Sequence, residues 1–83
     1  GEERLLDAAG RHFRPVGGIG EALAGDLLIF RWREGCAAKH AGIHAGEGYF
    51  IHAYEQAAVI RSPLAPAWRR RIAGVFRFPE LTR

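Results

Sequence analysis

Two histidines, His40 and His52, are the residues of this 83-residue chain that are best suited to catalysis. An imidazole exchanges protons near neutral pH, and a second imidazole can pair with its other ring nitrogen and fix its tautomer. His40 opens one alternating segment and His52 lies near the end of the next, on either side of Gly46-Glu47-Gly48. This pattern favours a β-hairpin with one histidine on each strand.

The register of that hairpin decides whether the two side chains meet. A three-residue glycine loop pairs residues whose numbers have an even sum, which puts four side positions on one face: His40, Gly42, His44 and His52. A two-residue loop would leave His40 and His52 on opposite faces, as ordinary polar residues of a half-buried sheet. On the first register, Gly42 leaves room beside the base for a substrate backbone. His44 is then an orienting group, a substrate contact or a surface residue, and we favour the surface role.

A metal site and a thiol nucleophile are the other chemical interpretations. Three histidines, His40, His44 and His52, would suffice for catalytic zinc, but the sequence offers no dedicated carboxylate, although Glu55 is close, so we do not expect a metal. Cys36 is the only cysteine, which excludes an internal disulfide. A reactive thiolate needs a helix N-terminus or an adjacent imidazole, whereas Cys36 follows Glu34 and a glycine in a loop. We expect an incidental loop thiol.

The charge balance is modestly positive, with twelve Lys and Arg against nine Asp and Glu, which gives +3. Such a charge favours anionic partners without choosing among them. The densest basic run is Trp68-Arg69-Arg70-Arg71, whose adjacent arginines point in different directions on a helical turn. We expect a solvated turn with Trp68 packed on the sheet, and we expect no nucleic-acid partner, although a small nucleic-acid-binding barrel stays an alternative.

The elements that must position these residues are one helix and several short strands. Apolar spacing predicts a helix over residues 3–14, glycines and a proline predict a loop over 15–25, and Asp26 fixes a turn. The alternating or apolar segments predict strands at 27–33, 40–45, 49–54, 57–61 and 74–78, with helical turns within 66–72. The sequence therefore predicts an α+β fold: an N-terminal helix followed by a small antiparallel, barrel-like sheet of about five strands.

Three blocks of the sequence resemble NlpC-type cysteine peptidases, which have a papain-like fold and hydrolyse cell-wall peptides. The blocks are GDLLIF at 25–30, KHAGI at 39–43 and GEGYFIHA at 46–53. They follow the family's patterns of Gly-Asp before an apolar run, His-x-Gly-Ile, and Gly-x-Gly before two apolar residues and His-Ala. The segment 57–79 resembles the branch found in phage and prophage tail-associated peptidases.

The resemblance implies that His40 is the catalytic histidine and that His52 is the polar residue that orients it. The mechanism that it implies needs no cofactor. The family's nucleophile is a cysteine at the start of a helix, well before the Gly-Asp strand, and this sequence has no such block. Cys36 follows that strand instead, and the chain contains no Met. We therefore expect residues 1–83 to be a single partial domain, the C-terminal portion of a cysteine endopeptidase. Its half-barrel spans 26–79, and alone it should be inactive.

The substrate that the resemblance implies is the peptidoglycan stem peptide, cut between D-glutamate and a diamino acid. Other phage tail proteins are possible partners, and so is self-association through apolar surface that a missing helix would cover. The alternative is a non-catalytic peptidoglycan-binding or phage-tail structural module. We expect no membrane partner, because no apolar run approaches the length of a bilayer span. There is no signal-peptide pattern, and the sequence by itself leaves the localisation unknown. The resemblance to the phage-tail branch implies bacterial cytoplasmic synthesis with assembly into a phage-like particle.

Overall fold

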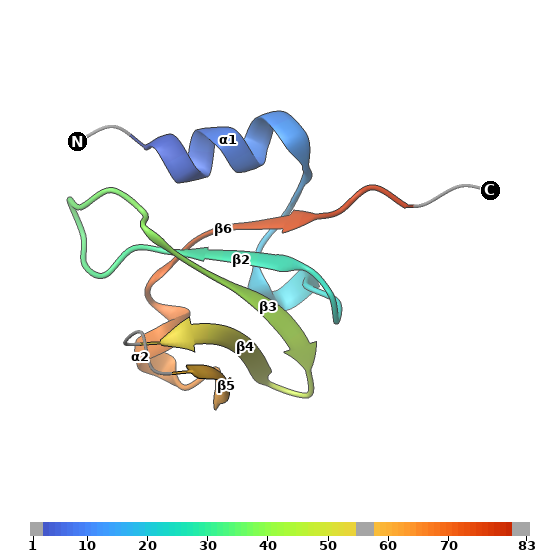
Figure 1. Cartoon of the computed structure of the whole chain (residues 1–83), viewed down its shortest axis with the longest axis vertical. Coiled ribbons are helices and arrows are strands. Elements are labelled where there is room, and N and C mark those ends of the chain that lie inside the picture. Colours follow the sequence, from blue (N-terminus) through green and yellow to red (C-terminus); the bar gives the residue numbers. More distant parts are fainter. Residues whose placement is uncertain (1–2, 55–57, 81–83) are drawn as a thin grey trace.

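The computed structural model describes residues 3–54 and 58–80 of the chain. Its elements begin with the longest helix and continue mainly as strands (Figure 1). They are α1 (Arg4–His12), β1 (Arg14–Val16), the 3-10 turn η1 (Ile19–Glu21), β2 (Leu27–Phe30), β3 (His40–Gly46), β4 (Tyr49–Tyr54), β5 (Ala58–Pro63), α2 (Pro66–Arg69) and β6 (Ile72–Arg77). The predicted α+β class is confirmed. None of the described helices is long and apolar enough to span a membrane.

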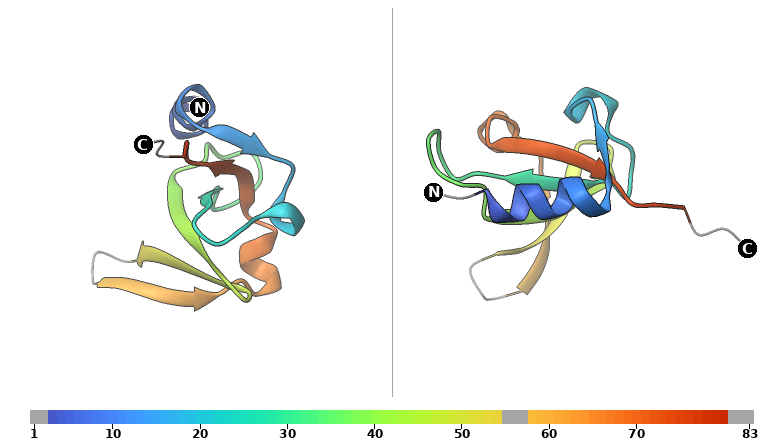
Figure 2. Two further views of the ribbon diagram at one scale, coloured as in Figure 1. Left: turned by 90° about the vertical axis from the view of Figure 1, so that its right-hand side faces the viewer. Right: turned by 90° about the horizontal axis from the view of Figure 1, so that it is seen from above.

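The six strands form one antiparallel sheet in the order β1-β6-β2-β3-β4-β5. β1 and β5 are its two edges and do not pair with each other, so the sheet is open. The predicted barrel-like closure is therefore wrong, and the sheet has six strands rather than about five. Figure 2 shows α1 at one end of the molecule and the β4–β5 hairpin at the other. Helical segments cover the faces of the sheet, so apolar surface is buried without closure.

The additional strand is β1, which lies where the sequence predicts the end of a helix and the start of a loop. The helix ends at His12, and Arg14 and Val16 then pair with Arg77 and Val75 of β6. Pro15 cannot donate a backbone hydrogen bond, but an edge strand tolerates it. A three-residue strand that contains proline carries almost no sequence pattern, which explains why the prediction missed it.

The remaining boundaries differ from the predictions by a few residues. β2 ends at Phe30 rather than at residue 33, because its pairing with β6 becomes irregular at Ile29 and Phe30. β5 extends to Pro63, whereas Ala57, its predicted first residue, lies outside the described residues. α2 is limited to four residues, and β6 begins two residues earlier than predicted.

α1 packs its apolar side on one face of β2 and β6. Ala9 of the helix is 3% exposed and lies in a cluster with Ile29 and Phe76. Gly74 of β6 lets the helix come close, because a Cβ at that position would lie 2.9 Å from Cδ1 of Leu6. The helix therefore covers the face of the sheet that alternation assigns to Ile29.

Glu3 ties the start of α1 to the loop between β2 and β3. Its carboxylate accepts hydrogen bonds from the backbone N–H of Ala38 at 2.8 Å and from Nη1 of Arg31 at 2.7 Å. The hydrogen bond from Ala38, and next in size the one from Arg31, hold the pKa of the Glu3 carboxyl below its ordinary value. These two hydrogen bonds hold the loop between β2 and β3 against the start of α1.

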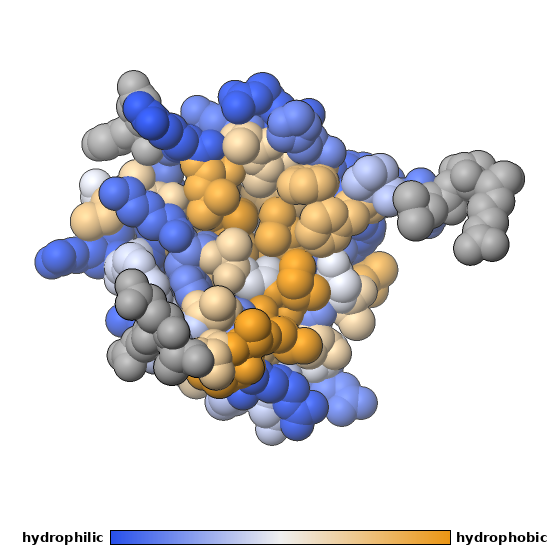
Figure 3. Space-filling view, in the orientation of Figure 1, coloured by the Kyte–Doolittle hydropathy of each residue, from blue (hydrophilic) through white to orange (hydrophobic). Residues whose placement is uncertain are grey.

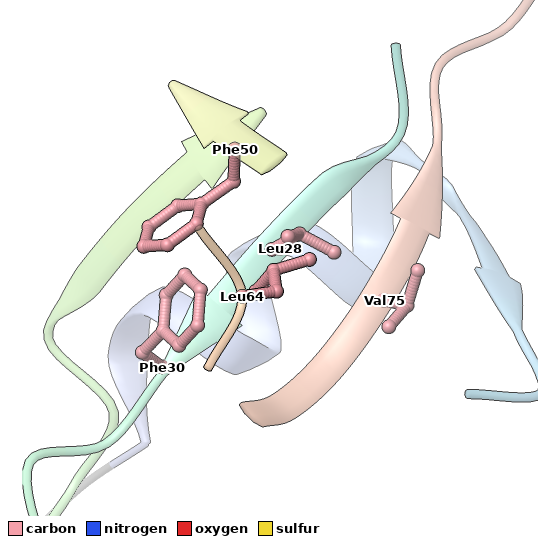
Figure 4. Close-up of a cluster of buried hydrophobic side chains, with 5 residues drawn as sticks. All are labelled: Leu28, Phe30, Phe50, Leu64 and Val75. Carbon is pink, nitrogen blue, oxygen red and sulfur yellow. The ribbon is translucent and has the colours of Figure 1, made fainter. Parts of the chain in front are cut away.

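The opposite face of the sheet holds the larger core cluster (Figure 4). Its buried members come from β2, β4, β6 and the segment after β5, and each is at most 4% exposed: Leu28, Phe30, Phe50, Leu64 and Val75. η1 and α2 contribute the partly buried side chains of Ile19 and Trp68. Full burial of side chains of this size stabilises the fold by about 1.5–3 kcal/mol each.

The β3–β4 hairpin adopts the even-sum register, although its turn has two residues rather than three. Ile43 pairs with Ile51 and His44 with Phe50, so the paired numbers have an even sum. Gly46 pairs with Tyr49, so the turn is Glu47 and Gly48, and a register shift between His44 and Gly46 restores the even sum further along the strands. All three residues 46–48 have positive φ, which glycine adopts without strain at two of the positions. The predicted face shared by His40 and His52 is therefore confirmed, but a β-bulge beside a two-residue turn produces it, and the predicted three-residue loop is wrong.

Asp26 joins the entry of β2 to the end of β6. Its side chain is 3% exposed and accepts hydrogen bonds from the backbone N–H of Leu23 at 2.8 Å and from Nε and Nη2 of Arg77 at 2.9 and 2.8 Å. The Arg77 hydrogen bond holds the pKa of Asp26 below its ordinary value. The predicted turn-fixing role is confirmed, and the ion pair to β6 was not foreseen.

Candidate functional site

The structure brings His40 and His52 into direct contact. Nε2 of His40 lies 2.8 Å from Nδ1 of His52, a hydrogen-bond distance in which one nitrogen donates and the other accepts. The two ring planes are inclined by 82°, with their centres 5.0 Å apart. The contact follows from the register, since even-numbered residues of β3 and β4 share the face that carries Phe50.

Gly42 makes the close approach of the two strands possible. A Cβ at this buried position would lie 3.0 Å from the carbonyl oxygen of Ile51, 3.3 Å from Cβ of His52 and 2.9 Å from Cδ2 of Phe50. The space above Gly42 is therefore filled by side chains of β4, which sets the position of His52. The contact of Gly42 with a substrate stays a prediction.

Ser62 extends the pair to a third residue. Its Oγ lies 2.9 Å from Nε2 of His52, so both ring nitrogens of His52 are hydrogen bonded. Ser62 pairs with Phe50 across β4 and β5, which puts it on the same face as His52, one position diagonally away. The sequence analysis missed this residue. Alternation within 58–63 could have indicated which face of β5 carries Ser62. It could not say which residue of β4 lies opposite, because that register depends on the loop between the two strands.

Burial keeps both imidazoles neutral near pH 7. His52 is 3% exposed, and loss of water around it lowers its pKa, with the nearby His40 lowering it further. Burial likewise lowers the pKa of His40. A neutral imidazole can accept a proton, so the environment favours the base form of His40.

Aromatic side chains surround His40 on several sides. The ring centres of Trp32 and Trp68 lie 4.9 and 5.8 Å from that of His40, and Tyr54 lies 6.5 Å away. His40 is only half-buried, and Trp32 is 41% exposed. The site is therefore desolvated yet reachable from outside. The sequence predicted that Trp68 packs on the sheet, but it did not foresee Trp32 and Tyr54 beside His40.

His44 is not part of this contact. Its backbone bonds to Gly25 and to Asp26, and its Nδ1 is buried without a hydrogen-bond partner among the described residues. No hydrogen bond in the described part of the chain joins it to His40 or His52. A role for His44 in substrate binding stays a prediction.

Cys36 is exposed in the loop between β2 and β3. The loop is held through its backbone: the carbonyl of Cys36 accepts a hydrogen bond from Arg31, and its N–H donates to the carbonyl of Arg33. Its sulfur makes no hydrogen bond to any described residue. The structure thus puts the thiol in an exposed loop, outside the histidine pair.

Metal binding has no support in the described geometry. Within residues 3–54 and 58–80, no three His, Cys, Asp or Glu side chains gather as metal ligands. His40 and His52 direct nitrogens at each other rather than at a shared point. Glu55, the carboxylate of the zinc alternative, lies outside the described residues.

The three consecutive arginines after Trp68 lie in two places. Nε of Arg69 donates to the carbonyl of Leu64 at 2.9 Å. Arg71 lies over the Trp68 ring, and Arg70 lines a groove with Arg71. The predicted separation therefore holds for Arg69 but not for Arg70 and Arg71, and the absence of a nucleic-acid partner stays a prediction.

Comparison with known proteins identifies the family. The NlpC/P60 family matches residues 8–77, which include His40, His52 and Ser62. No curated protein matches the chain significantly. Because the family match spans most of the chain, the resemblance noted in the sequence is confirmed at the family level. The chain belongs to the NlpC/P60 family of cell-wall peptidases, hydrolases that act on peptidoglycan.

Proposed function

We propose that this chain supplies the general base and its orienting residue to a cysteine endopeptidase that cuts peptidoglycan stem peptides. The observation that carries the proposal is the 2.8 Å contact between His40 and the buried His52. A pair of imidazoles in which one is solvent-accessible and the other is enclosed matches a base and the group that positions it.

The hydrogen-bond chain favours one tautomer. If Oγ of Ser62 accepts the Nε2–H of His52, then Nδ1 of His52 carries a lone pair and accepts the Nε2–H of His40. Nδ1 of His40 is then unprotonated. It makes no hydrogen bond with the described residues, so its lone pair is available to a nucleophile.

The reaction follows from that arrangement. Nδ1 of His40 takes the proton of a cysteine thiol, and the thiolate attacks the peptide carbonyl to form a C–S bond. The imidazolium then protonates the leaving amine as the C–N bond breaks. His40 then removes a proton from a water molecule, whose oxygen attacks the thioester carbonyl. The C–S bond breaks, and the imidazolium of His40 returns the proton to the sulfur. His52 stabilises each protonated form of His40 without exchanging a proton itself.

The thiol comes, in this proposal, from a segment outside the 83 residues. The exposed position of Cys36, in a loop tied toward α1, supports an external nucleophile. We propose accordingly that the chain is the C-terminal part of a papain-like domain of the phage tail-associated branch, with tail proteins and further copies of itself as partners.

The test is cleavage of purified peptidoglycan by the intact protein that carries this domain, with released peptides identified by mass spectrometry. Removal of a general base costs about 10²–10⁴-fold in rate, and we expect His40→Ala to lose that much. His12→Ala, which removes an exposed histidine at the end of α1, is the matched control and should keep full activity. Unchanged turnover in His40→Ala would refute the proposal.

The nucleophile assignment has its own test. The 83-residue chain should release no peptides, and Cys36→Ser in the intact protein should leave the rate unchanged. Turnover by the isolated chain that disappears in Cys36→Ser would show that Cys36 is the nucleophile.

A non-catalytic peptidoglycan-binding module is the second candidate. The exposed loop position of the single thiol favours it, because no described sulfur approaches His40. This function predicts that His40→Ala in the intact protein leaves both lysis and peptidoglycan binding unaffected.

A further inference from the structure

We propose that a basic groove beside the histidine pair binds a free carboxylate of the stem peptide. The groove has a volume of about 530 Å³, within the range of small-ligand sites, and is lined by Trp32, Arg33, Glu34, Ala67, Arg70 and Arg71. The inference rests on the proposed peptidase function, and it names the substrate feature that is recognised and the residues that recognise it.

The charge of the lining favours an anion. Three arginines and one carboxylate, that of Glu34, border the groove, which leaves an excess of two positive charges. A guanidinium offers paired N–H donors whose geometry matches the two oxygens of a carboxylate. Stem peptides carry such carboxylates on D-glutamate and on the diamino acid.

The groove arginines differ from three other arginines of the chain, whose donors are already in use. Arg31, Arg69 and Arg77 direct their guanidinium groups to a carboxylate or a carbonyl of the protein. Within the described part of the chain, Arg33 and Arg70 make no side-chain hydrogen bond or ion pair. These two groups are therefore free to bind a ligand.

Among residues 3–54 and 58–80, Arg71 is held in place by contacts that leave its side-chain donors unused. Its Cζ lies 5.9 Å from the ring centre of Trp32 and 5.7 Å from that of Trp68, and its backbone carbonyl accepts the N–H of Arg31 at 2.8 Å. Stacking on an indole orients a guanidinium while leaving its edge open. A pre-oriented cation loses less entropy when a carboxylate binds.

Trp32 connects the groove to the reacting centre. Its ring lies 4.9 Å from that of His40 and also contacts Arg71, so a single indole separates the base from the groove. A peptide whose scissile carbonyl lies beside His40 would place a neighbouring carboxylate near Arg70 and Arg71. The groove would thus select peptides by the charge next to the cleaved bond.

The test compares two synthetic stem peptides that are identical except that the side carboxylates are free in one and amidated in the other. With the intact protein, we expect kcat/KM to favour the free carboxylates by about ten- to a hundredfold, the effect of one charge-assisted contact. In the double variant Arg33→Ala/Arg70→Ala, the preference for the free carboxylates should fall toward one. Both positions are exposed, so the double variant should fold normally.

Arg61→Ala is the matched control. Arg61 is also exposed, but its guanidinium lies over Tyr49, 4.5 Å from the ring centre, and it pairs with Ile51 rather than with the histidine face. This variant removes one positive charge, half of what the double variant removes, and should keep the full preference. A similar loss in Arg61→Ala would show a general charge effect and overturn the inference.

Other outcomes separate this inference from the proposed function. If the wild type cleaves the two peptides equally while His40→Ala is inactive, carboxylate binding by the groove is rejected and the peptidase function is retained. If His40→Ala is fully active, the proposed function fails, and calorimetric binding of the two peptides decides the groove. The groove inference would also be overturned if a single-stranded oligonucleotide bound the protein more tightly than the peptide with free carboxylates does, and if this oligonucleotide binding disappeared in Arg33→Ala/Arg70→Ala.

Discussion

At the scale of single residues, the candidate site depends on which nitrogen holds which proton. His52 is enclosed and hydrogen bonded at both ring nitrogens, so its tautomer is set by its neighbours rather than by water. His40 is hydrogen bonded through Nε2, and among the described residues its Nδ1 has no partner. Ser62 is hydrogen bonded to Nε2 of His52, and when its Oγ accepts there, Nδ1 of His52 is left to accept the Nε2–H of His40.

Ser62→Ala should therefore slow the reaction without weakening substrate binding. Without the Oγ acceptor, the Nε2–H of His52 is buried and unpaired. The free-energy cost of this unpaired donor favours the tautomer of His52 that is protonated at Nδ1, which cannot accept the Nε2–H of His40. We expect kcat to fall by about tenfold. KM should stay unchanged, and the acid limb of the kcat profile should shift. The measurement is the pH dependence of kcat in the intact protein.

Ser62→Thr is the control, because it keeps the hydroxyl and suits a strand. It should retain most of the wild-type rate. If Ser62→Ala matches the wild type across the pH range, Ser62 has no positioning role.

At the scale of the elements, the sequence predicted the hairpin and its two histidines because alternation and a glycine turn are local signals. The two possible registers followed from loop length, and only the structure decided between them. Ser62, Trp32 and Tyr54 reach the site through the register of a second hairpin and through the end of β2. Such contacts depend on how separate segments pair, which no local pattern encodes.

The Asp26–Arg77 ion pair is the contact that holds the entry of β2 against the end of β6. Asp26→Ala should lower the free energy of unfolding by about 2–4 kcal/mol, since it leaves Arg77 unpaired and removes the acceptor for Leu23. Chemical denaturation measures this change. Asp7→Ala removes an exposed carboxylate of α1 as a control and should change stability far less. Equal losses in both variants would contradict the role of Asp26.

The same pair has a pH dependence whose sign is fixed. The Arg77 hydrogen bond makes the pKa of Asp26 lower in the folded protein than its ordinary value, so the carboxylate stabilises the fold fully at a pH above that ordinary value. The contribution is lost as the pH falls through the lowered pKa. Wild-type stability should therefore fall more steeply than that of Asp26→Ala below about pH 4. Parallel curves would exclude this contribution.

At the scale of the whole molecule, the sheet is open and one of its edges is apolar. Val59 of β5 is 71% exposed, and Ile51 of β4 is 40% exposed, and hydrophobic surface extends over β3 and β4 in Figure 3. β5 pairs only with β4, so its other edge offers unpaired backbone groups. Exposed edges and apolar faces promote association between copies.

The isolated chain should therefore self-associate through β5. Light scattering should show a mass that rises with concentration, and Val59→Lys should shift the equilibrium to the monomer. Leu23→Lys, at a 60% exposed position in the loop before β2, should leave the association unchanged. A monomer at every concentration would contradict this prediction.

The most direct test of the account is nitrogen NMR of the imidazole rings near pH 7. It should show neutral rings, with His40 and His52 each protonated at Nε2 and bare at Nδ1, and a hydrogen bond from Nε2 of His40 to Nδ1 of His52. Burial lowers the pKa of both rings, so each should titrate at a lower pH than a solvent-exposed imidazole. A His40 ring protonated at Nδ1, or two rings that titrate independently at or above pH 6.5, would contradict the proposed base and its orienting partner.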